Sequence, residues 1–157
     1  MKYLKLTIIS ILFVGVATAQ FSQGSKTLGG GASYSSTTVG DADAVSTLVV
    51  APSVGYFVMD NISANVALTM MKVGDADATT AYGFGARYYM GSMYGGGTYY
   101  GSTAEGDDGS LTFRGGYLMG LGDGGNFFLD LYGSYNMGLG DAEMSTIQVG
   151  AGFATFF

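Results

Sequence analysis

The stretch Ser145-Thr-Ile-Gln-Val-Gly-Ala-Gly-Phe-Ala-Thr-Phe-Phe157 closes the chain and decides its fold. Every second residue from Ile147 to Phe157 falls on one mostly apolar face of an extended strand. The residues between them are small or polar, apart from Phe156. Alternation at a period of two indicates a strand that has a different neighbour on each face. If this strand belongs to a sheet, the rest of the chain should alternate in the same way.

Acidic, glycine-containing clusters divide the chain at nearly constant spacing, around Gly40, Gly74, Gly106 and Gly140, with shorter breaks between them. Gly and Asp at such points supply the positive φ angles and local hydrogen bonds of tight turns. A regular interval is typical of a repeated unit, here two strands with two connections. We therefore predict eight strands, at 26–36, 45–58, 62–72, 78–90, 93–103, 110–120, 126–137 and 144–157. The first and fifth contain so much glycine that the sequence does not fix which of their residues share a face.

The first residues have the pattern of a secretory signal. A short basic start is followed by an apolar run from Leu6 to Val16, and Ala17-Thr-Ala19 then offers a peptidase site before Gln20. The apolar run is too short to span a bilayer as a helix. We expect residues 1–19 to be a cleaved signal peptide and residues 20–157 to be a single barrel domain.

The composition excludes several classes of protein. Only 11% of the residues are charged, against about 25% in ordinary soluble domains. The chain has no Cys, which rules out a disulfide framework, and no His. Without either residue it cannot build the Ser-His or Cys-His devices of most hydrolases. We predict a protein that is not an enzyme and that needs no cofactor.

The alternating strands fit two barrels of opposite polarity, one soluble with an apolar interior and one in a membrane with an apolar exterior. The position of the charges distinguishes them. After the signal, the only charges inside strands are Lys26 and Lys72 at strand ends, together with Arg87, Arg114 and Asp130 on the small-residue face. An Arg that faced lipid near the midplane would cost about 2–4 kcal/mol. We therefore predict an all-β, antiparallel, up-and-down transmembrane barrel of eight strands, with Arg87, Arg114 and Asp130 clustered in its lumen.

Aromatic residues gather in two bands along the predicted strands. One lies beside the short breaks: Tyr56, Phe57, Tyr88, Tyr89, Tyr94, Phe127, Phe128, Phe156 and Phe157. The other lies nearer the opposite strand ends: Tyr34, Tyr82, Tyr99, Tyr100, Phe113 and Tyr135. Two such bands are typical of the interfacial girdles of a membrane barrel. The alternative is that they are scattered because strands favour aromatic residues.

Acidic residues concentrate on the first, third, fifth and seventh connections: Asp41, Asp43, Asp75, Asp77, Glu105, Asp107, Asp108, Asp141 and Glu143. In a barrel with an even number of strands these connections meet at one rim. Carboxylates converging there could hold divalent cations weakly, because hard cations take oxygen ligands. The calcium-loop spacing of an EF-hand is absent, so no specific metal site is predicted. The alternative is a solvated acidic rim that resists aggregation.

The signal pattern, the eight amphipathic strands and the terminal Phe resemble the small bacterial outer-membrane β-barrel family of the OmpX-like and OmpW-like proteins. The resemblance covers residues 20–157 and rests on architecture and the last strand. It implies an outer-membrane location with both termini periplasmic, and recognition of Phe153 and Phe157 by the barrel assembly machinery. It also implies periplasmic chaperones and outer-membrane lipid as partners. We expect a monomer that binds no nucleic acid and has a structural or envelope-interaction role. The alternative is a narrow channel or carrier for small or hydrophobic solutes.

Overall fold

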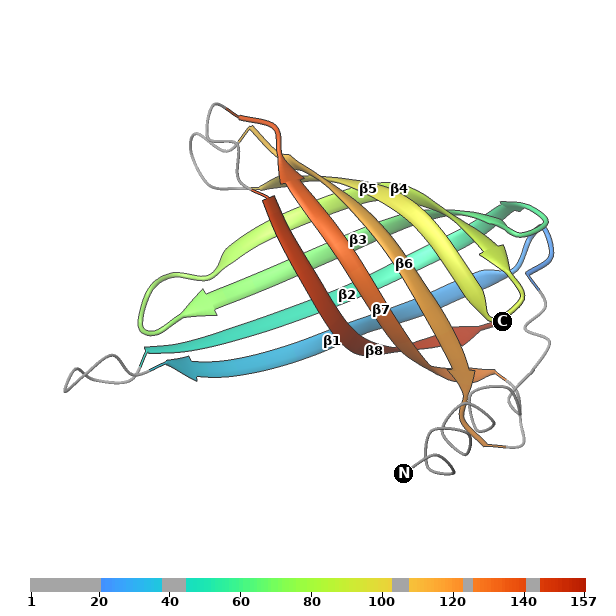
Figure 1. The fold of residues 1–157 in the computed structure, drawn as a ribbon, viewed down its shortest axis with the longest axis horizontal. Helices are drawn as coiled ribbons and strands as arrows, with labels where there is room; N and C mark the ends of the chain where they lie inside the picture. The colour runs from blue at the N-terminus through green and yellow to red at the C-terminus, as the bar shows by residue number, and fades with distance from the viewer. Residues whose placement is uncertain (1–20, 38–44, 103–107, 123–125, 141–144) are drawn as a thin grey trace, which may run out of the picture.

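The chain forms an all-β, closed, antiparallel barrel in which each strand pairs with its neighbours in chain order (Figure 1). The computed structural model describes residues 21–37, 45–102, 108–122, 126–140 and 145–157. The strands are β1 (Lys26–Thr37), β2 (Val45–Met59), β3 (Ile62–Val73), β4 (Thr79–Met90), β5 (Met93–Ser102), β6 (Ser110–Gly120), β7 (Phe127–Gly138) and β8 (Ser145–Phe156). The eight predicted strands are therefore confirmed, and their order is that of an up-and-down barrel. Within the described residues no helix has the length and apolar character needed to cross a membrane.

Tight turns at Asp60-Asn61 and Gly91-Ser92 identify one end of the barrel, here called the short-turn end. Asn61 has a φ of 65° and Gly91 a φ of 61°, the left-handed conformation that Gly and Asn adopt most readily. Lys26 and Phe157 lie at the same end and exchange two backbone hydrogen bonds of 2.7 and 3.0 Å. The connections after β1, β3, β5 and β7 lie at the opposite end, here called the long-connection end.

The predicted alternation sets the two surfaces of the wall. The outward rows are apolar and exposed, as with Leu68 on β3, Phe84 on β4 and Phe153 on β8. The inward rows hold the polar residues, among them Asn65 and Asp130, each only 6% exposed. The structure also shows which face of the two glycine-rich strands points inward. Thr27 of β1 and Tyr94 of β5 are buried inside the barrel. The neighbours of these two residues along the strands, such as Leu28, point outward.

Glycines face the largest inward side chains, which allows a narrow barrel to enclose them. A β-carbon at Gly150 would lie 2.6 Å from the ring of Tyr132, and one at Gly116 would lie 2.5 Å from the ring of Tyr94. Contacts that short do not occur between real atoms, so any larger residue would displace the ring. An eight-stranded barrel has an interior just wide enough for side chains to fill, and here glycine on one strand makes room for an aromatic residue on the next.

An aromatic plug fills the lumen at the short-turn end. It consists of Phe21, Phe57, Tyr89, Leu118, Phe128 and Phe156, all at most 8% exposed. The ring of Phe21 stacks on Tyr89 at 4.5 Å between centroids, and Phe156 meets the ring of Phe128 edge-on at 5.3 Å. The predicted girdle at this end is therefore only half right. Tyr56, Tyr88, Phe127 and Phe157 face outward, but the residues next to them in sequence turn into the lumen, because adjacent residues of a strand point to opposite faces. In the second band, Tyr100 likewise points inward.

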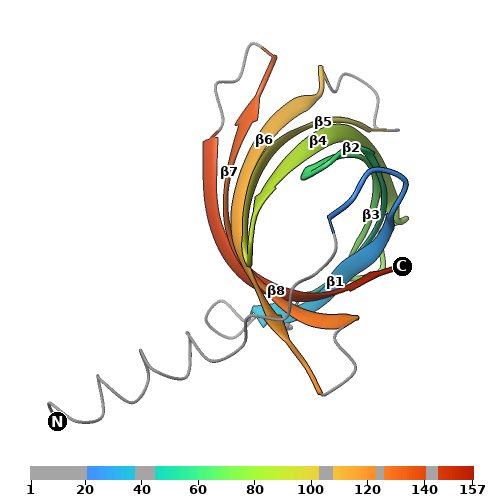
Figure 2. The ribbon, with the colours of Figure 1, turned by 90° about the vertical axis from the view of Figure 1, so that its right-hand side faces the viewer.

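The segment before β1 folds back over the plug. Phe21 accepts a backbone hydrogen bond of 2.7 Å from Asn61, and Gly24 donates one of 2.9 Å to Phe57. The Gln23 backbone N–H also donates to the Asp60 carboxylate at 2.8 Å. Figure 2 shows this segment, in blue, curling over the end of the barrel that faces the viewer. The predicted signal peptide, residues 1–19, lies outside the described residues.

The seam where the barrel closes, between β1 and β8, is short. Pairing there runs only from Thr27 opposite Phe156 to Gly30 opposite Phe153, whereas β1 pairs with β2 along its whole length. Beyond Gly30 the two strands diverge toward the long-connection end, and Figure 1 shows β8 turning away from β1. Ile147 and Val149 in the divergent part of β8 are 81% and 82% exposed. The wall is thus continuous at the short-turn end and loosely joined along the other half of the seam.

Candidate functional site

A layer of charged and polar side chains lies in the lumen above the aromatic plug. Arg87 comes from β4, Tyr94 from β5, Arg114 from β6, and Asp130 and Tyr132 from β7. All five belong to the inward rows. The register places the two arginines on either side of one residue, because Gly96 of β5 pairs with Arg87 on β4 and with Arg114 on β6.

The centre of this layer is the Asp130 carboxylate. Arg114 Nη2 donates to Asp130 Oδ2 at 3.0 Å, and the Tyr94 hydroxyl donates to the same carboxylate at 2.9 and 3.0 Å. The Arg114 side chain is 26% exposed and that of Asp130 only 8%. A buried carboxylate needs such partners, because an unpaired charge in a low-dielectric interior is costly.

Both guanidinium groups also lie against aromatic rings. Cζ of Arg114 lies 3.3 Å from the centroid of the Tyr132 ring, and Cζ of Arg87 lies 5.3 Å from that of Tyr94. Such cation–π contacts add about 0.5–2 kcal/mol each. Tyr94 therefore links the two arginines, because its ring faces Arg87 while its hydroxyl binds the partner of Arg114. The ring of Tyr94 also lies 5.6 Å from that of Tyr89, which connects the ionic layer to the plug.

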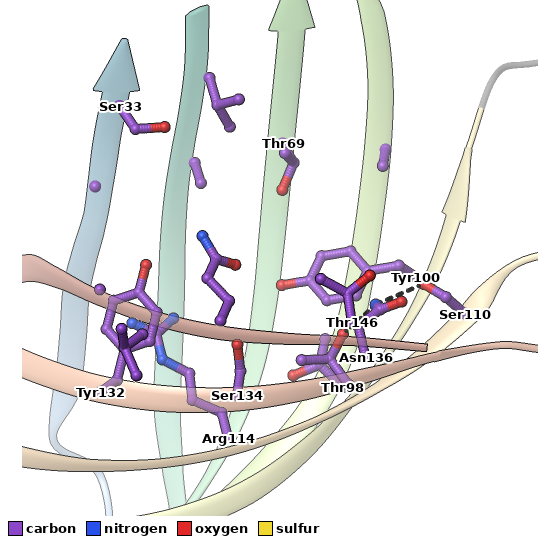
Figure 3. Close-up of a pocket in the computed structure, with 18 of the residues that line it drawn as sticks. Ser33, Thr69, Thr98, Tyr100, Ser110, Arg114, Tyr132, Ser134, Asn136 and Thr146 are labelled. Atoms are coloured by element: carbon purple, nitrogen blue, oxygen red, sulfur yellow. Dashed lines mark hydrogen bonds between the residues drawn. The ribbon is translucent and has the colours of Figure 1, made fainter. Parts of the chain in front are cut away.

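Above the ionic layer, toward the long-connection end, the lumen is a cavity of about 620 Å³, here called the cup (Figure 3). Arg87, Arg114 and Tyr132 form part of its lining. The rest is mostly hydroxyl, amide and small side chains. Asn136 organises one wall by donating to Ser110 at 3.1 Å and to Thr112 at 2.7 Å. The other polar lining residues are Ser33, Thr69, Thr98, Tyr100, Ser134, Thr146 and Gln148.

The predicted lumen cluster of Arg87, Arg114 and Asp130 shares one layer, with Arg114 and Asp130 in direct contact. Phe153 and Phe157, the predicted assembly signal, both face outward. Of the predicted acidic rim, the structure describes Asp75, Asp77 and Asp108, and all three are exposed. The other six rim acids, Asp41, Asp43, Glu105, Asp107, Asp141 and Glu143, lie outside the described residues. Within the described part of the chain, no group of three or more acidic residues could hold a metal ion.

Two important lumen residues were not part of the predicted cluster. Tyr94 lies in the glycine-rich fifth strand, where too few side chains alternate to reveal the inward face. The period-two series from Tyr94 through Thr98 to Tyr100 is the only signal that could have placed it there. Phe21 precedes the first strand, and no strand pattern includes it.

Comparisons with protein-family models, curated proteins and solved structures find no match for this chain. The resemblance to the OmpX-like and OmpW-like proteins therefore stays a prediction that rests on architecture. The described geometry offers two features from which function can be inferred, the apolar outer wall and the polar lumen.

Proposed function

We propose that this chain is an integral outer-membrane β-barrel protein with a structural or envelope-interaction role. The observation that carries the proposal is the polarity of the wall. Large apolar side chains project from all eight strands and are between a third and four-fifths exposed, while Arg87, Arg114 and Asp130 lie inside. Soluble monomers rarely expose contiguous apolar patches larger than a few hundred Å². Hydrocarbon is the solvent that suits such a surface.

The lysines on strands also fit this placement. Lys26 begins β1 and lies near the short-turn end, whereas Lys72 is the next-to-last residue of β3 and lies near the long-connection end. A Lys at the edge of an apolar band can extend its ammonium group into the aqueous interface while its methylenes stay on the band. Between these two levels the outward rows of the described strands carry no charge.

A structural role fits the lumen better than a pore does. The aromatic plug occupies the lumen at the short-turn end, and Phe57 within it is fully buried. Planar-bilayer recordings of the folded protein should therefore show no stable conductance. A carrier, the other alternative to a structural role, has a specific observation in its favour, namely the cup of about 620 Å³. We place it second because a cup closed at one end holds a solute without passing it on.

The membrane placement can be tested with one pair of neighbouring residues. Leu68 and Thr69 are adjacent near the middle of β3, and their side chains point outward and into the cup respectively. In a bilayer, Leu68→Arg should cost about 2–4 kcal/mol of folding free energy. Thr69→Arg, which places the same charge in a polar cavity, should cost much less. Urea titrations of both variants folded into lipid vesicles give the comparison.

A soluble barrel gives the opposite result. An exposed Leu→Arg change in water usually alters stability by no more than about 0.5 kcal/mol, and it would improve solubility. If Leu68→Arg folds as stably as the unsubstituted protein and remains in solution without detergent, the membrane proposal is wrong.

Assembly and topology follow from the same proposal. Phe153 and Phe157 would be read by the barrel assembly machinery, after periplasmic chaperones deliver the chain. Both ends of the barrel chain would be periplasmic, with the long-connection end and its acids facing outward. We propose a monomer in contact with outer-membrane lipid, without catalytic activity, cofactor or nucleic-acid partner. A change of Phe157→Ala that slows insertion by the purified assembly machinery, but not spontaneous folding into detergent, would support this route.

A further inference from the structure

The ionic layer holds an excess of positive charge. It contains two guanidinium groups, from Arg87 and Arg114, and one carboxylate, from Asp130. Among the described residues the only ion pair is Arg114 with Asp130. Asp130 therefore pairs with Arg114 alone, and the layer carries one positive charge, that of Arg87, without a matching acid.

Uncompensated charge in a lumen is costly, since proteins normally pair buried charges or bind a counterion. The ring of Tyr94 beside Arg87 offsets only part of this cost, because a cation–π contact contributes about 2 kcal/mol and an unpaired buried charge costs several kcal/mol. Arg114 shows a second deficit, because its Nε is buried and has no hydrogen-bond acceptor. The unmatched positive charge therefore indicates that this layer can accept an anion.

The cup supplies the space for such an acceptor. Its volume of about 620 Å³ lies within the range of about 300–1,000 Å³ typical of small-molecule sites. Arg87 and Arg114 both line it, and the wall beyond them carries hydroxyl and amide groups from Thr69, Thr98 and Asn136 (Figure 3). A single inorganic ion would leave most of the cup and its polar wall unused.

We propose that the cup binds a small hydrophilic organic monoanion, with its carboxylate against Arg87 and Arg114 and its hydroxyl groups on the polar wall. The single negative charge matches the single excess positive charge of the layer. A carboxylate suits the site because guanidinium groups bind it through paired, charge-assisted hydrogen bonds. The binding site does not depend on the membrane placement, since a soluble barrel with this lumen would have it as well.

The acids at the long-connection end do not prevent anion binding. Asp75, Asp77 and Asp108 are exposed on connections, and at physiological ionic strength salt screens exposed charges over about 8 Å. The guanidinium groups act on the ligand by direct contact, where screening is weak. Raising the salt concentration should therefore weaken binding only modestly.

Isothermal titration calorimetry on the protein folded in a non-ionic detergent tests the proposal, with glucuronate, glucose and glucose 6-phosphate as probes. The first two differ by one carboxylate on the same sugar, and the third is mostly a dianion at pH 7. We expect glucuronate to bind in a 1:1 ratio, at least tenfold more tightly than glucose and more tightly than glucose 6-phosphate. Equal affinity for glucose and glucuronate, or no heat with either, would overturn the proposal. Tighter binding of the phosphate would show an anion site but overturn the match to a monoanion.

Two variants that change the excess charge of the layer in opposite directions separate a charge effect from a folding effect. Arg87→Gln removes the excess charge and should weaken glucuronate binding at least tenfold, whereas Lys72→Gln makes the same change in net charge on the outer wall and should leave binding unchanged. Asp130→Asn raises the excess to two and should strengthen binding at least threefold. A loosened lumen would weaken binding in both lumen variants. If Arg87→Gln does not fold, Ser134→Leu, which fills the cup beside Arg114, should abolish binding, and unchanged binding in that variant would overturn the proposed site.

Discussion

Replacing Asp130 by Asn tests whether the ionic layer stabilises the barrel. The substitution preserves the shape of the side chain and removes its charge. The Tyr94 hydroxyl keeps an acceptor in the Asn oxygen, but the Asn amide presents an N–H group toward Arg114, where a carboxylate oxygen now accepts at 3.0 Å. The Arg114–Asp130 pair is lost, and two guanidinium groups remain in the lumen with no acid between them.

The expected loss of stability follows from how deeply the Arg114–Asp130 pair is buried. Breaking a buried ion pair by removing one partner costs about 3–5 kcal/mol. The Asp130 side chain is 8% exposed but that of Arg114 is 26% exposed, so water compensates part of the loss and the lower end applies. We expect Asp130→Asn to lower the free energy of unfolding by about 3 kcal/mol, which is about a hundredfold in the folding equilibrium.

Urea unfolding in detergent, followed by the shift between folded and unfolded bands on an unheated gel, gives this free energy. The double variant Arg114→Gln with Asp130→Asn completes a mutant cycle, because it replaces the pair by two neutral amides. Its cost should be about 2 kcal/mol smaller than the sum of the two single costs, since neither charge is then left alone. A cost below 1 kcal/mol for Asp130→Asn, or strict additivity in the cycle, would refute the assigned role of the pair.

Three further predictions concern the plug, the glycines and the rim. Phe57→Ala should lower the free energy of unfolding by about 3–5 kcal/mol because it leaves a cavity in the plug, whereas the outward-facing Phe113→Ala should cost clearly less in the same urea titration; equal costs would contradict a packed plug. Gly150→Val should cost about 1–3 kcal/mol through its clash with Tyr132, while Gly133→Val, whose β-carbon meets nothing closer than 4.0 Å, should be nearly neutral. Millimolar Ca²⁺ or Mg²⁺ should leave the melting temperature unchanged, and an upward shift would reveal a cation site on the acidic rim.

The sequence predicted the wall of this barrel better than its contents. Strands such as β3 alternate strictly between apolar and small or polar residues, and that pattern follows directly from their two different environments. The inward position of Arg87, Arg114 and Asp130 could be inferred for the same reason. Where glycine replaces side chains, as in β5, there is no alternation to follow, and the sequence does not determine the inward face.

Aromatic residues were the main source of error in predicting which side chains face outward and which face the lumen. Tyr and Phe stabilise both a lipid interface and a packed interior, so a run such as Phe127-Phe128 does not reveal how its members divide. The structure divides them by strict alternation, which places Phe128 in the plug and leaves Phe127 outside. The part played by Phe21 depends on a contact between the chain's beginning and the β2–β3 turn, and local sequence patterns carry no information about contacts of that kind.

The short ladder between the first and last strands makes the barrel a rolled sheet with one loose corner. In residues 31–37 and 145–152 at that corner, the alternate backbone amides that point across the seam have no partner strand there, so they should exchange with deuterium long before the amides of β3 and β4. Local opening of the wall would begin where β1 and β8 diverge, and it would widen the barrel at the long-connection end only. The short-turn end would keep its diameter, because the ring of Phe156 on β8 packs against that of Phe57 on β2 across the closed half of the seam.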